Sequence, residues 1–336
     1  MLKIEILFLA LISLCPACNF QLKESHMLKN KKAKNISCDI ETRICSTTTS
    51  TNKIEEINLN KKQKVKVIYY TDPICSACWA IEPELKKFMI EYGDFIDMEY
   101  KMGGLLPGWE GFSDAQNGIS SPRDVASHWD EVGQFSGMSI DGDIWLEDPL
   151  SSSFPPSIAF KAMQNQGEEK ALKFLRSIRE MVFLEKKNIT REEHLIKAAE
   201  KGGGDVDKFL SDYHNSETLK SFHEEIQQGR EMGVRGFPTF IFVGKNGMGY
   251  KLSGTSGYEN YVVALEKAFD QKLAAKTIIM TEEDLLNKYG FLASREISFV
   301  LSQKESITIA NLEVLAKEGR IQKVHQKYGL FWRSLK

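Results

Sequence analysis

The chain has 336 residues, enough for two domains or for one enlarged domain with a small one. Hydrophobic residues make up 42% of the sequence and charged residues 27%, as in ordinary soluble globular proteins. The formal net charge of −2 gives no global signal for binding to nucleic acid or to a membrane surface. No apolar run is long enough to form a transmembrane helix.

The first residues resemble an export signal. Residues 6–14 read ILFLALISL, which resembles the h-region of a secretory signal and is too short to span a bilayer. We therefore expect residues 1–18 to be a signal or lipoprotein signal segment, with a lipidated Cys18 as membrane anchor. Cys15 stands where lipoprotein signals usually have an aliphatic residue. The prediction is a cell-envelope or periplasmic protein, and the alternative is a start at Met27, which predicts a cytoplasmic protein.

Residues 19–60 have the composition of a disordered tether, because Lys, Asn, Ser and Thr dominate them. Cys38 and Cys45 lie inside this segment. They are either an accessory redox pair or local disulfide, or two exposed thiols without a role, and the sequence leaves both open. Their spacing does not suit a zinc knuckle.

A strand, a turn and a helix surround the most informative motif. Residues 64–70 read KVKVIYY and predict a buried strand, because β-branched and aromatic side chains dominate them. Residues 71–74 predict a turn with Pro73, which cannot continue a strand ladder. The apolar spacing becomes helical over 76–92, and residues 95–102 predict a second strand.

Helical patterns then dominate residues 105–230, and strands return afterwards. The predicted helices span 125–135, 157–164, 170–184, 191–201, 205–214 and 217–232. Strands at 237–243 and 250–253 and a helix at 258–269 follow. This order predicts an α/β fold, a thioredoxin-like domain over residues 61–272 that is split by a helical insertion at 105–230.

Cys75 and Cys78 form a C-x-x-C motif at the start of the predicted helix. Free N–H groups and the helix dipole favour negative charge there, so we expect a lowered pKa at the Cys75 thiol. Cys75 would then be the attacking thiolate, and Cys78 would resolve the mixed disulfide. The alternatives are half a zinc site, which lacks a second ligand pair, or two buried structural thiols.

Two prolines support a redox site. Pro83 lies inside the predicted helix, where a proline costs about 3 kcal/mol and kinks the helix. Pro238 directly precedes a predicted strand, and we predict that the Phe237–Pro238 peptide bond is cis. That bond would leave the local backbone free to pair with a substrate chain beside Cys75.

These segments resemble the DsbA family of thioredoxin-like dithiol–disulfide oxidoreductases and isomerases over residues 64–272. The motifs that carry the resemblance are DPICSACWA (72–80), MGGL (102–105) and GVRGFPT (233–239). Inside the insertion, IWLEDP (144–149) and SSFP (152–155) resemble one subgroup. That subgroup is similar to predicted dithiol isomerases and to adaptor proteins of an ATP-dependent protease.

The resemblance implies that Cys75 and Cys78 are catalytic and that Pro238 is the cis-proline beside them, without cofactor or metal. The expected substrate-binding residues are Trp79, Phe237 and Thr239. The dipeptide between the cysteines is Ser-Ala and contains no His, which would stabilise the thiolate. Oxidant, reductase and isomerase behaviour therefore all stay open.

Other residues have weaker assignments. We expect Trp109, Trp129, Trp145 and Phe154 mainly in the core, with Trp79 as the exception that lines a groove. The histidines show no metal-ligand spacing and are expected at the surface or as caps; they include His128, His194, His214 and His223. Asp72 either tunes the thiol pair or is an ordinary turn residue before proline.

Residues 275–336 lie outside the resemblance and predict a small C-terminal module. Its predicted helices span 281–289, 295–303 and 309–318, and strand-like alternation follows from 320 to 332. Thr281 and Asp284 suggest an N-cap for the first helix. Three helices and a β-ribbon resemble a winged helix. No helix carries a dense basic face, so we expect a packing or interaction module without nucleic-acid binding.

The leading hypothesis is a thiol–disulfide oxidoreductase or isomerase that acts on protein cysteines and needs a redox partner protein. One alternative is a thioredoxin-like adaptor or binding protein for a protease, with a redox-sensing dithiol. Another is a glutathione-dependent transferase or isomerase of the kappa type, against which the second cysteine argues. A redox-controlled DNA-binding protein is the remotest alternative.

Overall fold

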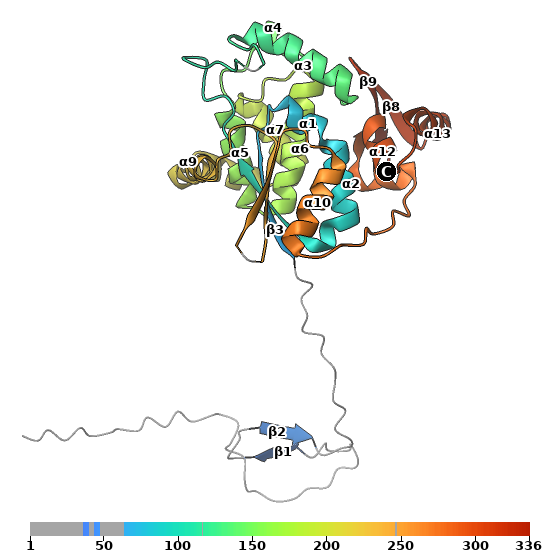
Figure 1. Ribbon diagram of the computed structural model, residues 1–336. Coiled ribbons are helices and arrows are strands. Elements are labelled where there is room, and N and C mark those ends of the chain that lie inside the picture. The colour runs from blue at the N-terminus through green and yellow to red at the C-terminus, as the bar shows by residue number, and fades with distance from the viewer. Residues whose placement is uncertain (1–35, 40–43, 48–63, 116, 246) are drawn as a thin grey trace, which may run out of the picture. The chain divides into compact units, whose positions relative to one another are not determined.

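A computed structural model describes residues 36–39, 44–47, 64–115, 117–245 and 247–336 (Figure 1). The predicted signal segment 1–18, with Cys18, lies outside the described residues, as does Met27. The chain divides into two units, Met1–Leu59 and Asn60–Lys336. Across the described ranges, no helix has the length and apolar character that a membrane span requires.

The first unit contains a short antiparallel hairpin that the sequence analysis does not predict. Strand β1 (Ile36–Asp39) pairs with β2 (Ile44–Thr47), and Cys38 is opposite Cys45 in the register. This register brings the two backbone positions together, as a local disulfide or redox pair requires. It leaves open which of the two roles the cysteines have.

A four-stranded mixed sheet lies at the centre of the second unit. Strand β3 (Val65–Thr71) runs parallel to β4 (Ile96–Met102) and antiparallel to β5 (Thr239–Val243), which pairs with β6 (Gly249–Ser253). The predicted split is confirmed, because strands from before and after the insertion share one sheet. The apolar run of β3 is buried on both faces from Tyr69 to Thr71.

Two helices pack on one face of this sheet and on each other (Figure 1). Helix α2 (Glu82–Tyr92) follows the short helix α1 (Ser76–Ala80), and α10 (Tyr258–Phe269) follows β6. The 3-10 turn Gly93–Phe95 connects α2 to β4. The kink predicted at Pro83 is confirmed, because the helix is interrupted at Ile81 and Pro83 lies in the first turn of α2. The interruption places Cys75 and Cys78 on a short separate turn.

Seven helices of the insertion form the other layer and hold the largest hydrophobic cluster. They are α3 (Pro122–Ser136), α4 (Ile144–Glu147), α5 (Phe154–Gln164), α6 (Glu168–Leu184), α7 (Glu192–Lys201), α8 (Val206–Tyr213) and α9 (Ser216–Glu231). The 17-residue α6 buries every side chain from Ser177 to Leu184, which makes it the central helix of this layer.

The C-terminal segment forms helices and a three-stranded antiparallel sheet of order β7-β9-β8. Its elements are α11 (Glu282–Tyr289), β7 (Phe291–Ala293), α12 (Ser294–Val300), α13 (Glu305–Lys317), β8 (Ile321–Gln326) and β9 (Gly329–Ser334). The expected N-cap is present, since Thr281 and Asp284 form a capping box. Strand β7 is too short to be recognised from periodicity, and the winged-helix resemblance stays a prediction.

This segment packs firmly against the rest of the second unit. Phe291, Ala293 and Phe331 belong to the same buried cluster as the insertion helices. At the tip of the β8–β9 hairpin, the Lys327 ammonium lies 3.0–3.1 Å from the carboxylates of Asp130, Asp141 and Asp143. The segment therefore contributes side chains to the main core, whereas the sequence predicts a separate module.

Candidate dithiol site

The structure brings four of the predicted site residues together. Cys75 is the N-cap of α1, and its Sγ accepts the Cys78 backbone N–H at 3.2 Å. The Cys75 Sγ also lies 3.6 Å from the carbonyl oxygen of Phe237, whose peptide bond to Pro238 is cis as predicted. Both thiols are free, and the exposed fraction is 5% at Cys75 and zero at Cys78.

The protonation of the pair differs from the sequence-based prediction. Burial raises the pKa of the Cys75 thiol well above its usual value, and the neighbouring Cys78 adds to this. At Cys78 burial also acts to raise the pKa, but a hydrogen bond from Cys75 and the positive charge of Arg179 outweigh it and lower the pKa. The prediction of a lowered pKa at Cys75 is therefore wrong, because burial and Cys78 outweigh the backbone N–H that favours the thiolate. The positive charge of Arg179 thus favours ionisation of Cys78 over that of Cys75.

A buried arginine lies beneath the dithiol. Arg179, on α6, is 1% exposed and donates to Glu82 Oε1 at 2.8 Å and to Thr71 Oγ1 at 2.6 Å. It also donates to the backbone oxygen of Asp72 at 3.3 Å. The Arg179 charge is thus held where it favours the Cys78 thiolate. No motif predicts this residue, because it lies about a hundred positions from its partners in the sequence.

Asp72 is a buried carboxylate directly before the motif. Its Oδ2 accepts the Leu105 N–H at 2.8 Å and the Ser153 hydroxyl at 2.9 Å, and its Oδ1 accepts the Ile74 N–H at 3.1 Å. Burial raises the pKa of Asp72 to about 6, although these hydrogen bonds and Arg179 act to lower it. The carboxylate connects the dithiol turn to Leu105 and Ser153 of the insertion. Asp72 is therefore not only a turn residue before Pro73.

Because of Asp72 we expect stability to fall as the pH rises from about 4 to about 6. The unfolded carboxyl titrates near 3.8 and the folded one near 6, so in this window the folded state binds a proton that the unfolded chain releases. The stability present below pH 4 should decrease by about 3 kcal/mol once Asp72 is ionised. Urea unfolding at several pH values would measure this. Asp72→Asn should remove this component, whereas the exposed control Asp207→Asn should keep it.

A cavity of about 810 Å³ opens beside Cys75. Its lining includes Cys75 and Phe237, so the reactive turn and the cis-proline loop share one wall. The insertion contributes aromatic side chains to the lining, namely Trp109, Trp129 and Trp145. These rings pack edge-to-face at centroid distances of 5.2–5.8 Å. The cavity lining combines aromatic side chains with a few polar ones, such as His128 and Asn117, as binding sites in proteins usually do.

Two predicted substrate-binding residues are corrected by the structure. Trp79 is completely buried, and its indole N–H donates to the Ser139 carbonyl oxygen at 3.0 Å. Thr239 is completely buried too, and its hydroxyl donates to the Gly236 carbonyl oxygen at 2.8 Å. Neither side chain lines the cavity, whereas Phe237 does.

One histidine lies closer to the motif than the sequence predicts. The Nε2 of His128, on α3, is 3.5 Å from the Ser76 hydroxyl, and His128 lines the cavity. It therefore belongs to the site and not to the outer surface. Within the ranges that the structure describes, no group of His, Cys, Asp and Glu side chains is arranged to hold a metal ion.

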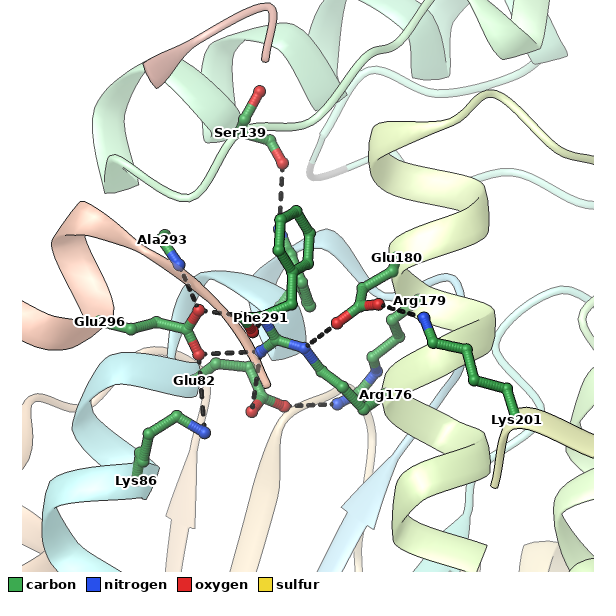
Figure 2. Close-up of polar contacts among 11 residues, drawn as sticks. Glu82, Lys86, Ser139, Arg176, Arg179, Glu180, Lys201, Phe291, Ala293 and Glu296 are labelled. Carbon is green, nitrogen blue, oxygen red and sulfur yellow. Dashed lines mark hydrogen bonds and ion pairs between the residues drawn. The ribbon is translucent and has the colours of Figure 1, made fainter. Parts of the chain in front are cut away.

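Ion pairs extend from this site across the buried interface with the C-terminal segment (Figure 2). Glu82, which pairs with Arg179, is also 3.9 Å from Nη1 of Arg176. Arg176 forms a bidentate pair with Glu296 of the C-terminal segment at 2.8 and 3.0 Å. Its guanidinium also lies over the Trp79 ring, 4.6 Å from the centroid. Neither Arg176 nor Arg179 is among the site residues that the sequence predicts.

Comparison with known proteins places this geometry in a family. A family profile described as thioredoxin matches residues 69–263, more than half of the chain. The ClpXP adapter protein SpxH of Halalkalibacterium halodurans is 35% identical over 301 residues, which cover 89% of this chain and 97% of that protein. The protein of the same name from Bacillus subtilis is 31% identical over 279 residues, which cover 82% and 90% of the two chains.

A solved structure supports the fold. A protein from Nitrosomonas europaea that is proposed to be a disulfide isomerase superposes with a TM-score of 0.52 at 20% identity. The superposition covers 62% of this chain and 97% of that one. The expected resemblance to DsbA-like proteins, and to the protease-adaptor subgroup among them, is confirmed. The chain belongs to the thioredoxin-fold family that includes the ClpXP adapter proteins named SpxH.

Proposed function

We propose that this protein is an adaptor that delivers substrate proteins to the ClpXP protease, and that the Cys75–Cys78 pair makes it sensitive to redox conditions. The observation that carries the proposal is the extent of the similarity to the SpxH adapter proteins. About a tenth of the chain lies outside the match, which is less than the length of the C-terminal segment. The similarity therefore includes parts of the chain beyond the thioredoxin core.

The dithiol geometry favours the adaptor function over that of a dithiol oxidoreductase. An enzyme that turns over protein disulfides needs an accessible thiolate at the attacking cysteine. Here Cys75 is 5% exposed and burial raises its pKa. The positive charge of Arg179 favours ionisation of Cys78, which is completely buried. Such a pair exchanges slowly with bulky substrates, yet a small oxidant can still reach it through the cavity.

The test is protein turnover in cells that encode the chain. Half-lives across the proteome would be compared in the wild type, in a strain lacking this gene, in a strain lacking ClpX, and in the double deletion. We expect at least one protein to be stabilised equally in all three deletion strains. The full chain should restore its degradation in the single deletion. If no ClpX-dependent protein changes its half-life when the gene is removed, the adaptor proposal is wrong.

A dithiol oxidoreductase is the second candidate, and one observation favours it. The cavity places Cys75 and Phe237 on the same wall, next to the cis peptide bond. A substrate cysteine entering the cavity would meet the Cys75 sulfur first, since Cys78 does not line it. Thiol exchange and protease delivery can be separated by removing the two sulfurs.

A further inference from the structure

Helix α6 carries two arginines one turn apart that face different parts of the molecule. Arg179 donates to Thr71 and to the Asp72 carbonyl oxygen next to the dithiol turn. Arg176 faces Glu296 of the C-terminal segment (Figure 2). Glu82 joins them, with one carboxylate oxygen 2.8 Å from Arg179 and the other 3.9 Å from Arg176. The two guanidinium groups therefore share one carboxylate. A stronger interaction of Glu82 with one arginine weakens its interaction with the other.

Glu296 closes the network on the side of the C-terminal segment. It is completely buried, and its Oε2 accepts the backbone N–H of Ala293, the N-cap residue of α12, at 2.8 Å. Burial acts to raise its pKa, but the charges of Arg176 and Lys86 lower it, so Glu296 is ionised. Arg176 also donates to the Phe291 carbonyl oxygen at 3.1 Å, and residues 291–296 are thereby fastened to α6.

We propose that Glu296 is a positioning residue for the dithiol: acting through Arg176, Glu82 and Arg179, it sets the reduction potential of the Cys75–Cys78 pair. By reciprocity, the redox state of the pair sets how tightly residues 291–296 are held. This proposal rests on the dithiol of the proposed function and not on protease delivery. The similarity to the SpxH adapters and to thioredoxin assigns no role to Glu296.

The redox step is a simple exchange with a low-molecular-weight disulfide, RSSR. One sulfur of the pair attacks RSSR and releases RSH, and the second sulfur displaces the other RSH. The reacting form of the pair holds one thiol and one thiolate, and the positive charge of Arg179 favours the thiolate at Cys78. The Cys75–Cys78 disulfide forms and the S–S bond of RSSR breaks; the thiol proton leaves with one RSH, and the second RSH takes its proton from water. Oxidation of the thiolate form thus removes a negative charge near Arg179.

The direction of the coupling follows from this charge. Without a thiolate, Arg179 interacts more strongly with Glu82. Arg176 then keeps Glu180, 2.8 Å from its Nε, and Glu296 as its partners, so oxidation strengthens the Arg176–Glu296 pair that holds residues 291–296. In the opposite direction, Glu296 pairs with Arg176, so Glu82 interacts mainly with Arg179. Glu82 then offsets the positive charge of Arg179, which stabilises the thiolate less. Neutralising Glu296 should therefore favour the reduced pair. Because the network is buried, water and salt screen these charges weakly.

The first test is the equilibrium of the full chain with reduced and oxidised glutathione. We expect Glu296→Gln to lower the equilibrium constant for disulfide formation about fivefold, which raises the reduction potential by about 20 mV. Glu313→Gln removes the same charge from the same segment, where Glu313 pairs only with Lys323 among the described contacts, and it should leave the potential unchanged. An equal shift in both variants, or no shift in Glu296→Gln, would overturn the proposal.

A cycle with Arg176→Met tests the route. If the coupling runs through the guanidinium, Glu296→Gln should shift the potential far less in the Arg176→Met background. A full shift in that background would reject the network. These potentials are measured without protease, so the adaptor proposal can fail while this one holds, and the reverse.

The wild-type chain gives an independent readout that needs no variant to fold. Amide hydrogen exchange of residues 291–300 should be slower in the oxidised protein than in the reduced protein, by a factor similar to the shift caused by Glu296→Gln. Residues 305–317 of α13, outside the network, serve as the internal control. Equal exchange at residues 291–300 in the two redox states would contradict the proposal.

Discussion

A chain carrying Cys75→Ser and Cys78→Ser is expected to lose thiol exchange and to keep protease delivery. A serine hydroxyl does not ionise near neutral pH, so exchange with a small disulfide should fall by roughly a thousandfold or more. The ClpX-dependent substrate should still be degraded in cells that express the variant under reducing conditions. Exchange would be followed by the release of the small thiol, and delivery by the half-life of that substrate.

The control for this variant retains the pair and removes the other thiols. It carries serine at Cys15, Cys18, Cys38 and Cys45 and should exchange like the wild type, because the pair in the thioredoxin domain is retained. Loss of delivery in the double-serine variant, with its fold intact, would make the oxidoreductase the principal function. Exchange that persists without Cys75 and Cys78 would remove the redox role from this site.

The thioredoxin core could be predicted because its signals are local. The apolar strand β3, the C-x-x-C motif and the return to strand at β5 each lie within a few residues, and their order is that of the sheet. The kink at Pro83 and the cis bond before Pro238 could also be predicted, since a proline restricts its own neighbourhood. Periodicity also located six of the seven helices of the insertion and missed the four-residue α4.

The charge network beneath the dithiol could not be predicted. Glu82 and Arg179 are 97 positions apart, and Arg176 and Glu296 are 120 apart. On α6 the residues Arg176, Arg179 and Glu180 have the spacing of an exposed, solvated helix face. The structure buries Arg179 and Glu180 because other parts of the chain supply their partners, Glu82 and Thr71 for Arg179 and Lys201 for Glu180. Periodicity detects apolar faces and is silent on paired charges.

Trp79 and Cys75 were mispredicted for a related reason. Trp79 follows Cys78, which suggests a place on the active surface, but Phe183 and Phe331 stack near it at 5.5 and 6.5 Å. Phe331 comes from the C-terminal segment, whose packing no local pattern reveals. At Cys75 the helix N-terminus favours a thiolate, but burial and the neighbouring Cys78 outweigh it and raise the pKa.

The Arg179→Met variant is expected to be strongly destabilised. It leaves the Glu82 carboxylate, whose side chain is only 16% exposed, with Arg176 at 3.9 Å as its remaining ion-pair partner. Removing one partner of a buried ion pair costs about 3–5 kcal/mol, most of it from the unpaired charge. The pKa of Cys78 should also rise, because the charge that lowers it is gone. Urea unfolding measures the first effect, and thiolate absorbance against pH measures the second.

Two further variants separate the two roles of Arg179. Arg191→Met breaks an exposed pair with Asp148 and should cost less than about 1 kcal/mol, which makes it the matched control for losing a salt bridge. In Arg179→Met with Glu82→Gln the unpaired charge is also removed, so much of the stability should return while the pKa of Cys78 stays raised. If the double variant restored both properties, Arg179 would act on the dithiol only through the fold. If Arg179→Met unfolded no more easily than Arg191→Met, the buried pair would contribute little to stability, and the route from Glu296 to the dithiol would lose its central link.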